Sequence, residues 1–376
     1  MVIRYSFVSV IILSVLAIIL SCTSANTFTT TTTATETVTT TISNDLSSID
    51  DFEATLEAIY SQTNPSVVYI EISSQISGGS GSGFVWDTDG NIVTNNHVVD
   101  GAENITVVFS DGTITEAEII GQDTDSDLAV IKVNIDSEKL KPVTMADSTQ
   151  LKVGQLVIAI GNPYGYQGTL TVGYISGLGR VLPTDDNITG PNYSIPDIIQ
   201  TDAAINPGNS GGVLLDDSGG VIGVTFSIVS ASGSSSGIGF VIPSAIVKKV
   251  VPSLISTGNY QHPYLGILIS SLIPEISEAM NLAPDQRGAL IREVTEGSPA
   301  DAAGLRASKD EVTIDGQQLF VGGDLIIKYD DKIVSGSDEL ITLLARYGSV
   351  GDVVTLTIIR DGNEIELQVI LGARPD

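Results

Sequence analysis

Cysteine and histidine are scarce in this chain of 376 residues. Cys22 is the single cysteine, so no disulfide can form within the chain and packing alone must hold the fold. His97 and His262 are the only two histidines, which leaves no His/Cys cluster for a structural zinc ion. We therefore expect no metal and no cofactor, and any imidazole catalyst must be one of these two residues.

Basic residues and aromatic residues are also few. The chain has 17 Lys and Arg against 45 Asp and Glu, giving a formal net charge of −28. Because phosphate binding needs clusters of Lys and Arg, this balance argues against nucleic acid as a partner. Aromatics make up only 5%, so a core must be built from Val, Ile, Leu and Ala. Glycines, 38 in all, among Val, Ile and Thr runs favour β architecture with tight turns.

The N-terminal segment, residues 1–22, has the pattern of a targeting device. Arg4 precedes an apolar run from Phe7 to Leu20, which is short for a membrane span of about 20 residues. The run ends in Ile19-Leu20-Ser21-Cys22, which resembles a bacterial lipobox with Cys22 as the lipidated residue. Lipidation of Cys22, an uncleaved anchor and ordinary signal cleavage remain open. All three place the rest of the chain outside the cytoplasm, and the first two attach it to the membrane.

The rest of the chain divides by composition. Residues 23–45 are dominated by threonine and lack hydrophobic periodicity, which predicts a disordered tether. Apolar residues then recur at helical spacing from about Asp45 to Tyr60. Two folded domains follow, residues 46–257 and 258–376, with a helix at about Pro243–Ser256 and Gly258 at the boundary.

Short apolar runs separated by turn residues fill the first domain and predict β-barrels or a sandwich. The second domain mixes strands with two helices, at about Pro274–Asn281 and Ser337–Arg346, and is a small α+β module. The strands expected in the first domain are Ser66–Ile72, Gly83–Trp86, Ile92–Thr94, Ile105–Phe109, Thr113–Gly121, Leu128–Val133, Leu156–Ile160, Leu170–Ser176, Ile198–Thr201, Gly212–Leu215, Val221–Ile228 and Gly239–Ile242. Those expected in the second are Leu265–Ile269, Gly288–Val294, Asp324–Tyr329, Val353–Arg360 and Ile365–Ile370.

A glycine-rich turn, Asn206-Pro207-Gly208-Asn209-Ser210-Gly211-Gly212, is the strongest chemical signal. A serine hydroxyl becomes a nucleophile only beside a base, and the oxyanion it generates needs convergent backbone N–H donors. Gly208 permits the unusual dihedral angles that aim its N–H and that of Ser210 the same way, so we expect Gly208, Asn209 and Ser210 to form an oxyanion hole. The motif alone leaves a simple Gly/Ser surface turn open.

Two further positions supply partners for Ser210. His97, in Thr94-Asn95-Asn96-His97-Val98-Val99, is the only histidine of the β-rich domain, whereas His262 lies at the domain boundary. Asp127 directly precedes an apolar strand, so we expect it to turn inward and orient His97, while Asp123 and Asp125 face solvent.

The chain order His, Asp, Ser is that of the chymotrypsin clan. Together with that order, several motifs resemble the HtrA/Deg family of serine proteases, and they are Ser82-Gly83-Phe84, Thr94–Val99, Ser126-Asp127-Leu128-Ala129-Val130, Gly161-Asn162-Pro163, Gln200–Asn206 and Gly208–Gly212. The resemblance implies a mainly β fold, a chymotrypsin-like double β-barrel followed by a small α+β PDZ domain. It also implies a likeness of Tyr264-Leu265-Gly266-Ile267 to the loop that binds a peptide's C-terminal carboxylate.

The resemblance also implies a substrate pocket and an assembly. Its pocket residues are Ala204, Ile205, Thr225 and Ile228; none is charged, so we expect small or medium apolar residues at the cleavage position. A homotrimer is implied, with Tyr60 and Tyr164 as contributors. We therefore expect an extracytoplasmic, ATP-independent endopeptidase that cleaves unfolded or damaged proteins. The alternative is a peptide-binding chaperone or stress sensor in which proteolysis is minor.

Overall fold

The computed structural model describes residues 46–74, 78–163, 168–183, 194–226, 237–314 and 316–375. Its large compact unit runs from Asp51 to Asp376. The predictions for residues 1–22, for Cys22 and for the tether lie outside the described residues. Within the described ranges, no helix is both long enough and apolar enough to cross a membrane.

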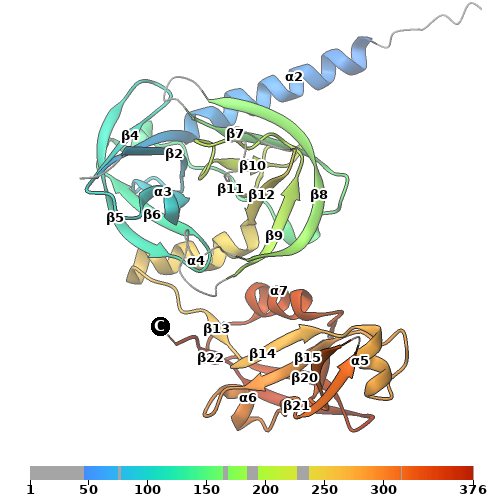
Figure 1. Ribbon diagram of the computed structural model, residues 1–376. Helices are drawn as coiled ribbons and strands as arrows, with labels where there is room; N and C mark the ends of the chain where they lie inside the picture. Colours follow the sequence, from blue (N-terminus) through green and yellow to red (C-terminus); the bar gives the residue numbers. More distant parts are fainter. Residues whose placement is uncertain are drawn as a thin grey trace, which may run out of the picture. The chain divides into compact units, whose positions relative to one another are not determined.

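Residues 67–133 of this unit form a closed six-stranded barrel (Figure 1). A short helix, α3 (Asn96–Val99), follows its third strand. In spatial order the strands are β1 (Val67–Ser73), β2 (Gly78–Val85), β3 (Asn91–Asn95), β6 (Leu128–Val133), β5 (Ile114–Asp123) and β4 (Asn104–Val108).

Residues 156–243 form another closed six-stranded barrel, joined to the first by a long connection. Two of its strands, β8 and β9, flank residues outside the described part. In spatial order the strands are β10 (Val213–Leu215), β11 (Val221–Phe226), β12 (Gly239–Pro243), β9 (Ser194–Thr201), β8 (Thr169–Pro183) and β7 (Leu156–Gly161). The prediction of a mainly β double barrel is confirmed.

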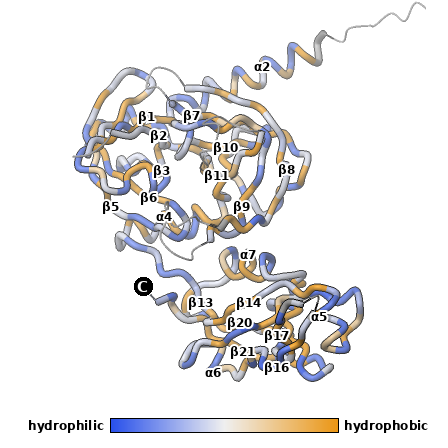
Figure 2. The backbone as a smooth tube through the Cα atoms, viewed as in Figure 1, coloured by the Kyte–Doolittle hydropathy of each residue, from blue (hydrophilic) through white to orange (hydrophobic). Residues whose placement is uncertain are grey.

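Strand β6 shows why some of the barrel strands are continuous apolar runs instead of alternating patterns. Leu128 and Val130 belong to the core shared with helix α4 (Ser244–Thr257), whereas Ala129 and Ile131 fill the interior of the first barrel. Successive side chains of a strand point to opposite faces, so a strand buried on both faces must be apolar throughout. Figure 2 shows hydrophobic residues recurring along the barrel strands in this way.

Two helices pack against the barrels. Helix α2 (Leu46–Thr63) packs Ile59 into the shared core, and its Tyr60 hydroxyl donates to the Gly168 carbonyl at 2.8 Å. Helix α4 ends at Gly258, which adopts a left-handed φ of 83° and donates its N–H to the Leu254 carbonyl. Both helices were predicted within a few residues of these bounds. Three 3₁₀ turns lie at Asn64–Ser66, Ser137–Lys139 and Ser148–Gln150.

The C-terminal domain has a sheet in the order β14-β15-β18-β20-β21, with β19 beside β18, and two separate strand pairs, β16–β17 and β13–β22. These two pairs, β19 and helix α6 were not predicted. The elements are β13 (Pro263–Tyr264), β14 (Ile267–Ser271), α5 (Pro274–Ala279), β15 (Ala289–Val294), α6 (Pro299–Ala302), β16 (Asp310–Ile314), β17 (Gln317–Val321), β18 (Leu325–Tyr329), β19 (Lys332–Ile333), α7 (Ser337–Tyr347), β20 (Val353–Arg360), β21 (Asn363–Ile370) and β22 (Gly372–Ala373).

Candidate active site

His97 and Asp127 meet because β3 and β6 are neighbours in the first barrel. Asn95, the last residue of β3, pairs with Leu128, the first residue of β6, so the residues just outside these strand ends lie together. The Nδ1 atom of His97 is 2.7 Å from Oδ2 of Asp127. The backbone N–H of His97 donates to the other carboxylate oxygen, Oδ1, at 2.9 Å. Both carboxylate oxygens therefore hold one residue, which fixes the position and the tilt of the imidazole ring.

Asp127 is fully buried and adopts a left-handed φ of 52°, a conformation that costs energy for a residue with a side chain. Its surroundings hold it there. The Asp127 carbonyl accepts hydrogen bonds from the Asn96 N–H and from Nδ2 of Asn95, each at 3.0 Å. The sequence prediction that Asp127 turns inward agrees with this burial.

Ser210 lies in the connection between β9 and β10 and is 5% exposed. The Asn209 N–H donates to the Asn206 carbonyl at 2.9 Å, and Gly208 between them has a φ of 91°. A four-residue turn with a left-handed third residue is a type II turn, which requires glycine at that position. Gly211 is equally constrained, because a Cβ there would lie 2.1 Å from the Ser82 carbonyl oxygen.

Ser82, on β2 of the first barrel, ties the Ser210 turn in place. Its hydroxyl donates to the Gly208 carbonyl and accepts from the Asn162 N–H, each at 2.7 Å. Its backbone N–H donates to the Ser210 carbonyl, also at 2.7 Å. The sequence motif contained Ser82 without assigning it a role. Only the approach of the two barrels shows that it positions the turn.

Phe226, the last residue of β11, links the two sides of the site. Its ring meets the His97 ring edge to face, with centroids 5.4 Å apart. The preceding residue, Thr225, accepts the Gly211 N–H at its carbonyl at 2.9 Å, and its hydroxyl donates to the Asn209 carbonyl at 2.6 Å. One strand end therefore contacts both the imidazole and the turn that carries the serine. The imidazole that the buried Asp127 orients and the turn that carries Ser210 therefore both lie against the end of β11.

The expected pocket residues occupy different environments. Ala204 is half-buried and its carbonyl accepts a hydrogen bond from the Thr171 hydroxyl at 3.0 Å. Ile205 is packed into the interior of the second barrel. Thr225 supports the turn, as described above. Ile228 lies outside the described residues, as does Tyr164.

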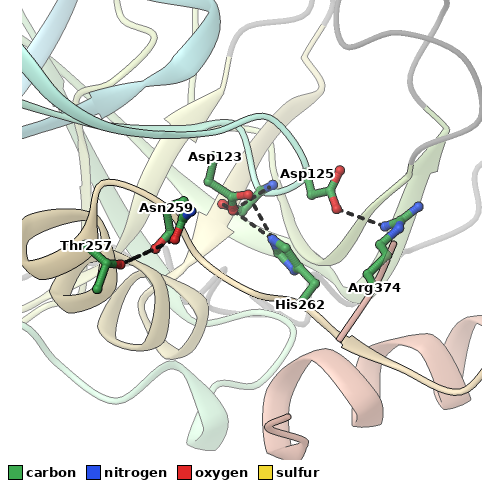
Figure 3. Close-up of polar contacts among 7 residues, drawn as sticks. Asp123, Asp125, Thr257, Asn259, His262 and Arg374 are labelled. Atoms are coloured by element: carbon green, nitrogen blue, oxygen red, sulfur yellow. Dashed lines mark hydrogen bonds and ion pairs between the residues drawn. The ribbon is translucent and has the colours of Figure 1, made fainter. Parts of the chain in front are cut away.

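The prediction that Asp123 and Asp125 face solvent is wrong. Asp123 is 7% exposed; its carboxylate lies 2.9 Å from Nε2 of His262 and accepts hydrogen bonds from Ser126. Asp125 accepts a hydrogen bond from Nη1 of Arg374 at 3.0 Å (Figure 3). Both partners come from the C-terminal half of the chain, and local sequence around the carboxylates carries no signal of them.

A groove of about 360 Å³ lies at the predicted carboxylate-binding loop of the C-terminal domain. Tyr264–Ile267 and β14 form one wall, and Leu340, Ile341 and Leu344 of α7 line the other. Leu265 and Ile267, two residues of the predicted loop, both border the groove. An extended peptide can therefore add to the β14 edge while its last side chain enters an apolar pocket.

Comparison with known proteins agrees with this architecture. Residues 81–224 match the trypsin-like peptidase domain, and residues 263–371 match the PDZ domain. Protease Do-like 1 from the chloroplast of Arabidopsis thaliana is 39% identical over 336 residues, covering 85% of this chain and 72% of that protein. A probable DegP-like periplasmic serine endoprotease from Hahella chejuensis is 40% identical over 79% of this chain.

Solved structures give the same result. The HtrA-type protease AlgW with a tripeptide superposes with a TM-score of 0.67 at 33% identity, covering 85% of this chain and 97% of that one. The double barrel and the PDZ domain define a serine endopeptidase of the trypsin-like class. Within that class, the chain belongs to the HtrA/Deg family. It spans 57% of the length of the Hahella relative.

Proposed function

We propose that Ser210 is the nucleophile, that His97 is the general base and that Asp127 orients it. His97 takes the Ser210 proton as Oγ attacks the peptide carbonyl, and it then returns the proton to the leaving amine. Asp127 stabilises the imidazolium that forms between these steps. Water then hydrolyses the acyl-enzyme by the reverse use of the same groups. The observation that carries the proposal is that both carboxylate oxygens of Asp127 contact His97. The His97 ring also packs against Phe226, at the strand end that contacts the Ser210 turn.

We assign the oxyanion hole to the turn Gly208–Ser210. The tetrahedral oxyanion needs N–H donors held in advance, because donors that must reorganise during the reaction contribute less. The type II turn and the Ser82 hydroxyl both constrain this backbone. Asn209 holds the shape of the turn, because its N–H donates to the Asn206 carbonyl and its carbonyl accepts from the Thr225 hydroxyl.

The proposed substrates are unfolded or damaged proteins outside the cytoplasm, cleaved after small or medium apolar residues. Two features support this class. DegP-like relatives carry the description of periplasmic endoproteases, and the PDZ groove has the size and apolar lining to take a protein's C-terminus. Attachment to a membrane through the N-terminal segment and assembly as a homotrimer belong to the same proposal.

A cleavage assay tests the assignment. Unfolded casein is incubated with the wild-type chain, with Ser210→Ala and with the exposed-serine control Ser256→Ala. We expect cleavage by the wild type and the control, and none by Ser210→Ala. In parallel, a fluorophosphonate probe labels an activated serine without needing substrate recognition, and we expect labelling in every chain except Ser210→Ala.

The outcomes separate the candidate functions. Cleavage or labelling that persists in Ser210→Ala contradicts the assignment of the nucleophile. Absence of both in the wild type, together with suppressed aggregation of an unfolded client, favours the peptide-binding chaperone or sensor. The groove beside α7 is the observation that keeps this second function in view.

A further inference from the structure

The carboxylate-binding loop of the PDZ domain turns its amides toward the groove. The Leu265 carbonyl accepts a hydrogen bond from the Ala300 N–H, and the Gly266 carbonyl accepts one from the Thr295 N–H, each at 2.9 Å. In a trans peptide the C=O and the following N–H point in opposite directions. The N–H groups of Gly266 and Ile267 therefore point away from these partners, toward the groove that both residues line.

Two amides orient a carboxylate but leave its charge uncompensated in a partly apolar groove. The segment before the loop, Gln261-His262-Pro263, contains neither lysine nor arginine. Nε2 of His262 already faces the Asp123 carboxylate at 2.9 Å. Among the described residues that line the groove, Arg374 is the only lysine or arginine.

Arg374 reaches the groove from the C-terminal end of the chain. Strand β22 pairs with β13, with Gly372 opposite Tyr264, and the Arg374 N–H donates to the His262 carbonyl at 2.9 Å. The backbone of Arg374 is thus fixed beside the carboxylate-binding loop. Its guanidinium donates to Asp125, which also lines the groove (Figure 3).

The ion pair between Arg374 and Asp125 is weak enough for another carboxylate to take the place of Asp125. The Arg374 side chain is 34% exposed and that of Asp125 is 18% exposed, so the contact is neither dry nor enclosed. A partly exposed pair of this kind contributes little, because the cost of removing its charges from water offsets much of their attraction. Burial raises the pKa of Asp125 above its ordinary value although Arg374 and His262 oppose the shift, so the ionised carboxylate is poorly stabilised where it stands.

We propose that Arg374 is a binding residue of the peptide groove, and that a peptide's terminal carboxylate draws its guanidinium away from Asp125. The proposal rests on the capture of C-termini by the PDZ domain and names the charge that this capture uses. Asp125 then acts as a competitor for Arg374 and lowers the affinity of the empty groove for carboxylate. No covalent step is involved; one ion pair replaces another.

Peptide binding to the full chain carrying Ser210→Ala, which prevents cleavage, tests the exchange. The probes are fluorescein-labelled hexapeptides Gly-Ser-Gly-Ser-Tyr-X with X as Val, Ile, Leu, Phe, Ala or Met, each with a free carboxylate and as its amide. We expect the free carboxylates to bind more tightly than the amides. Arg374→Gln should weaken binding of the tightest carboxylate about tenfold and leave the amide unchanged.

Asp125→Asn should change the affinity for the carboxylate peptide in the opposite direction. Removing the competitor should strengthen carboxylate binding up to about fivefold. In the double variant this gain should vanish, so that it binds like Arg374→Gln alone. Arg374→Lys keeps the charge and should retain most of the affinity, and Arg306→Gln, an exposed arginine of the same domain, is the matched control. Thermal unfolding of each variant checks that the fold is retained.

Each result has one meaning. If no free carboxylate binds better than its amide, C-terminal capture by the groove is refuted and the inference falls with it. If the preference exists but Arg374→Gln keeps it, capture stands and the role of Arg374 is refuted. If Asp125→Asn strengthens binding equally with and without Arg374, Asp125 repels the peptide directly and the exchange is refuted.

Discussion

Ser82→Ala removes one buried hydroxyl that connects the first barrel to the Ser210 turn. Ser82 is fully buried, and its hydroxyl satisfies both the Asn162 N–H and the Gly208 carbonyl. A buried polar group left without its partner costs about 1–3 kcal/mol. This cost applies to both partners of the hydroxyl, but water can reach the half-buried Gly208 and reduces its share. We therefore expect the free energy of unfolding to fall by about 2–4 kcal/mol in total.

The same substitution should slow the reaction. Without the hydroxyl the Gly208 carbonyl loses its anchor, so the backbone dihedral angles that place the Gly208 N–H in the proposed oxyanion hole are less restricted. Direct loss of one oxyanion donor costs about 10²–10³ in kcat. Ser82 acts through the backbone, so we expect kcat to fall by about 10- to 100-fold, with KM nearly unchanged.

Urea unfolding and steady-state hydrolysis of a chromogenic peptide measure the two effects separately. Ser80→Ala is the matched control, since Ser80 lies two residues earlier on the same strand and is exposed. The assay is run well below the urea midpoint so that every chain is folded. An unchanged kcat in folded Ser82→Ala would refute the positioning role, and an unchanged midpoint would refute the claim that its two hydrogen bonds are structural.

Three further predictions test the site and the domain contact. Asp127→Asn should lower kcat about 10⁴-fold while the chain stays folded, measured by hydrolysis and circular dichroism, because an amide can hold the wrong histidine tautomer. Gly211→Ala should abolish hydrolysis or folding, since its Cβ would meet the Ser82 carbonyl; an active, folded variant contradicts the close approach. Burial raises the pKa of the Asp197 carboxyl although its contact with Arg346 opposes the shift. The folded chain therefore binds the proton of this carboxyl more tightly than the unfolded chain does. The protonated Asp197 therefore stabilises the fold below its ordinary pKa of about 3.8, and this contribution is lost as pH rises through the higher pKa of the folded chain. Urea midpoints measured from pH 4 to 7 should fall less steeply with rising pH in Asp197→Asn than in the wild type. Equal slopes in the two chains would contradict this prediction.

The barrel strands that are buried on both faces were predictable, because such a strand is a continuous run of apolar residues. Leu128–Val133 is an example, predicted and observed with the same bounds. Strands β13 and β22 were not, since two residues carry no period and become a strand only by pairing with each other. The hairpin β16–β17 was missed as well, because its short strands mix polar and apolar residues and show no clear period.

The candidate site was predictable in its residue types but not in its supports. A single histidine in the β-rich domain and a serine among glycines leave few combinations, and the carboxylate beside an apolar strand completes them. Ser82 and Phe226 act across a distance in sequence, so no local pattern marks their roles. The same reason explains the error at Asp123 and Asp125, because His262 and Arg374, which contact them, lie more than a hundred residues away.

By itself, the sequence determined the class of chemistry. The scarcity of cysteine and histidine left no disulfide and no His/Cys cluster for zinc, and the motifs around His97, Asp127 and Ser210, through their resemblance to the HtrA/Deg family, indicated a serine endopeptidase on a β scaffold. Only the tertiary structure decided which groups hold that chemistry in place. Closure of each barrel aligns strand ends that are distant in the chain, and the β13–β22 pair brings Arg374 beside Asp125. Contacts of this kind depend on three-dimensional register, which one-dimensional spacing does not encode.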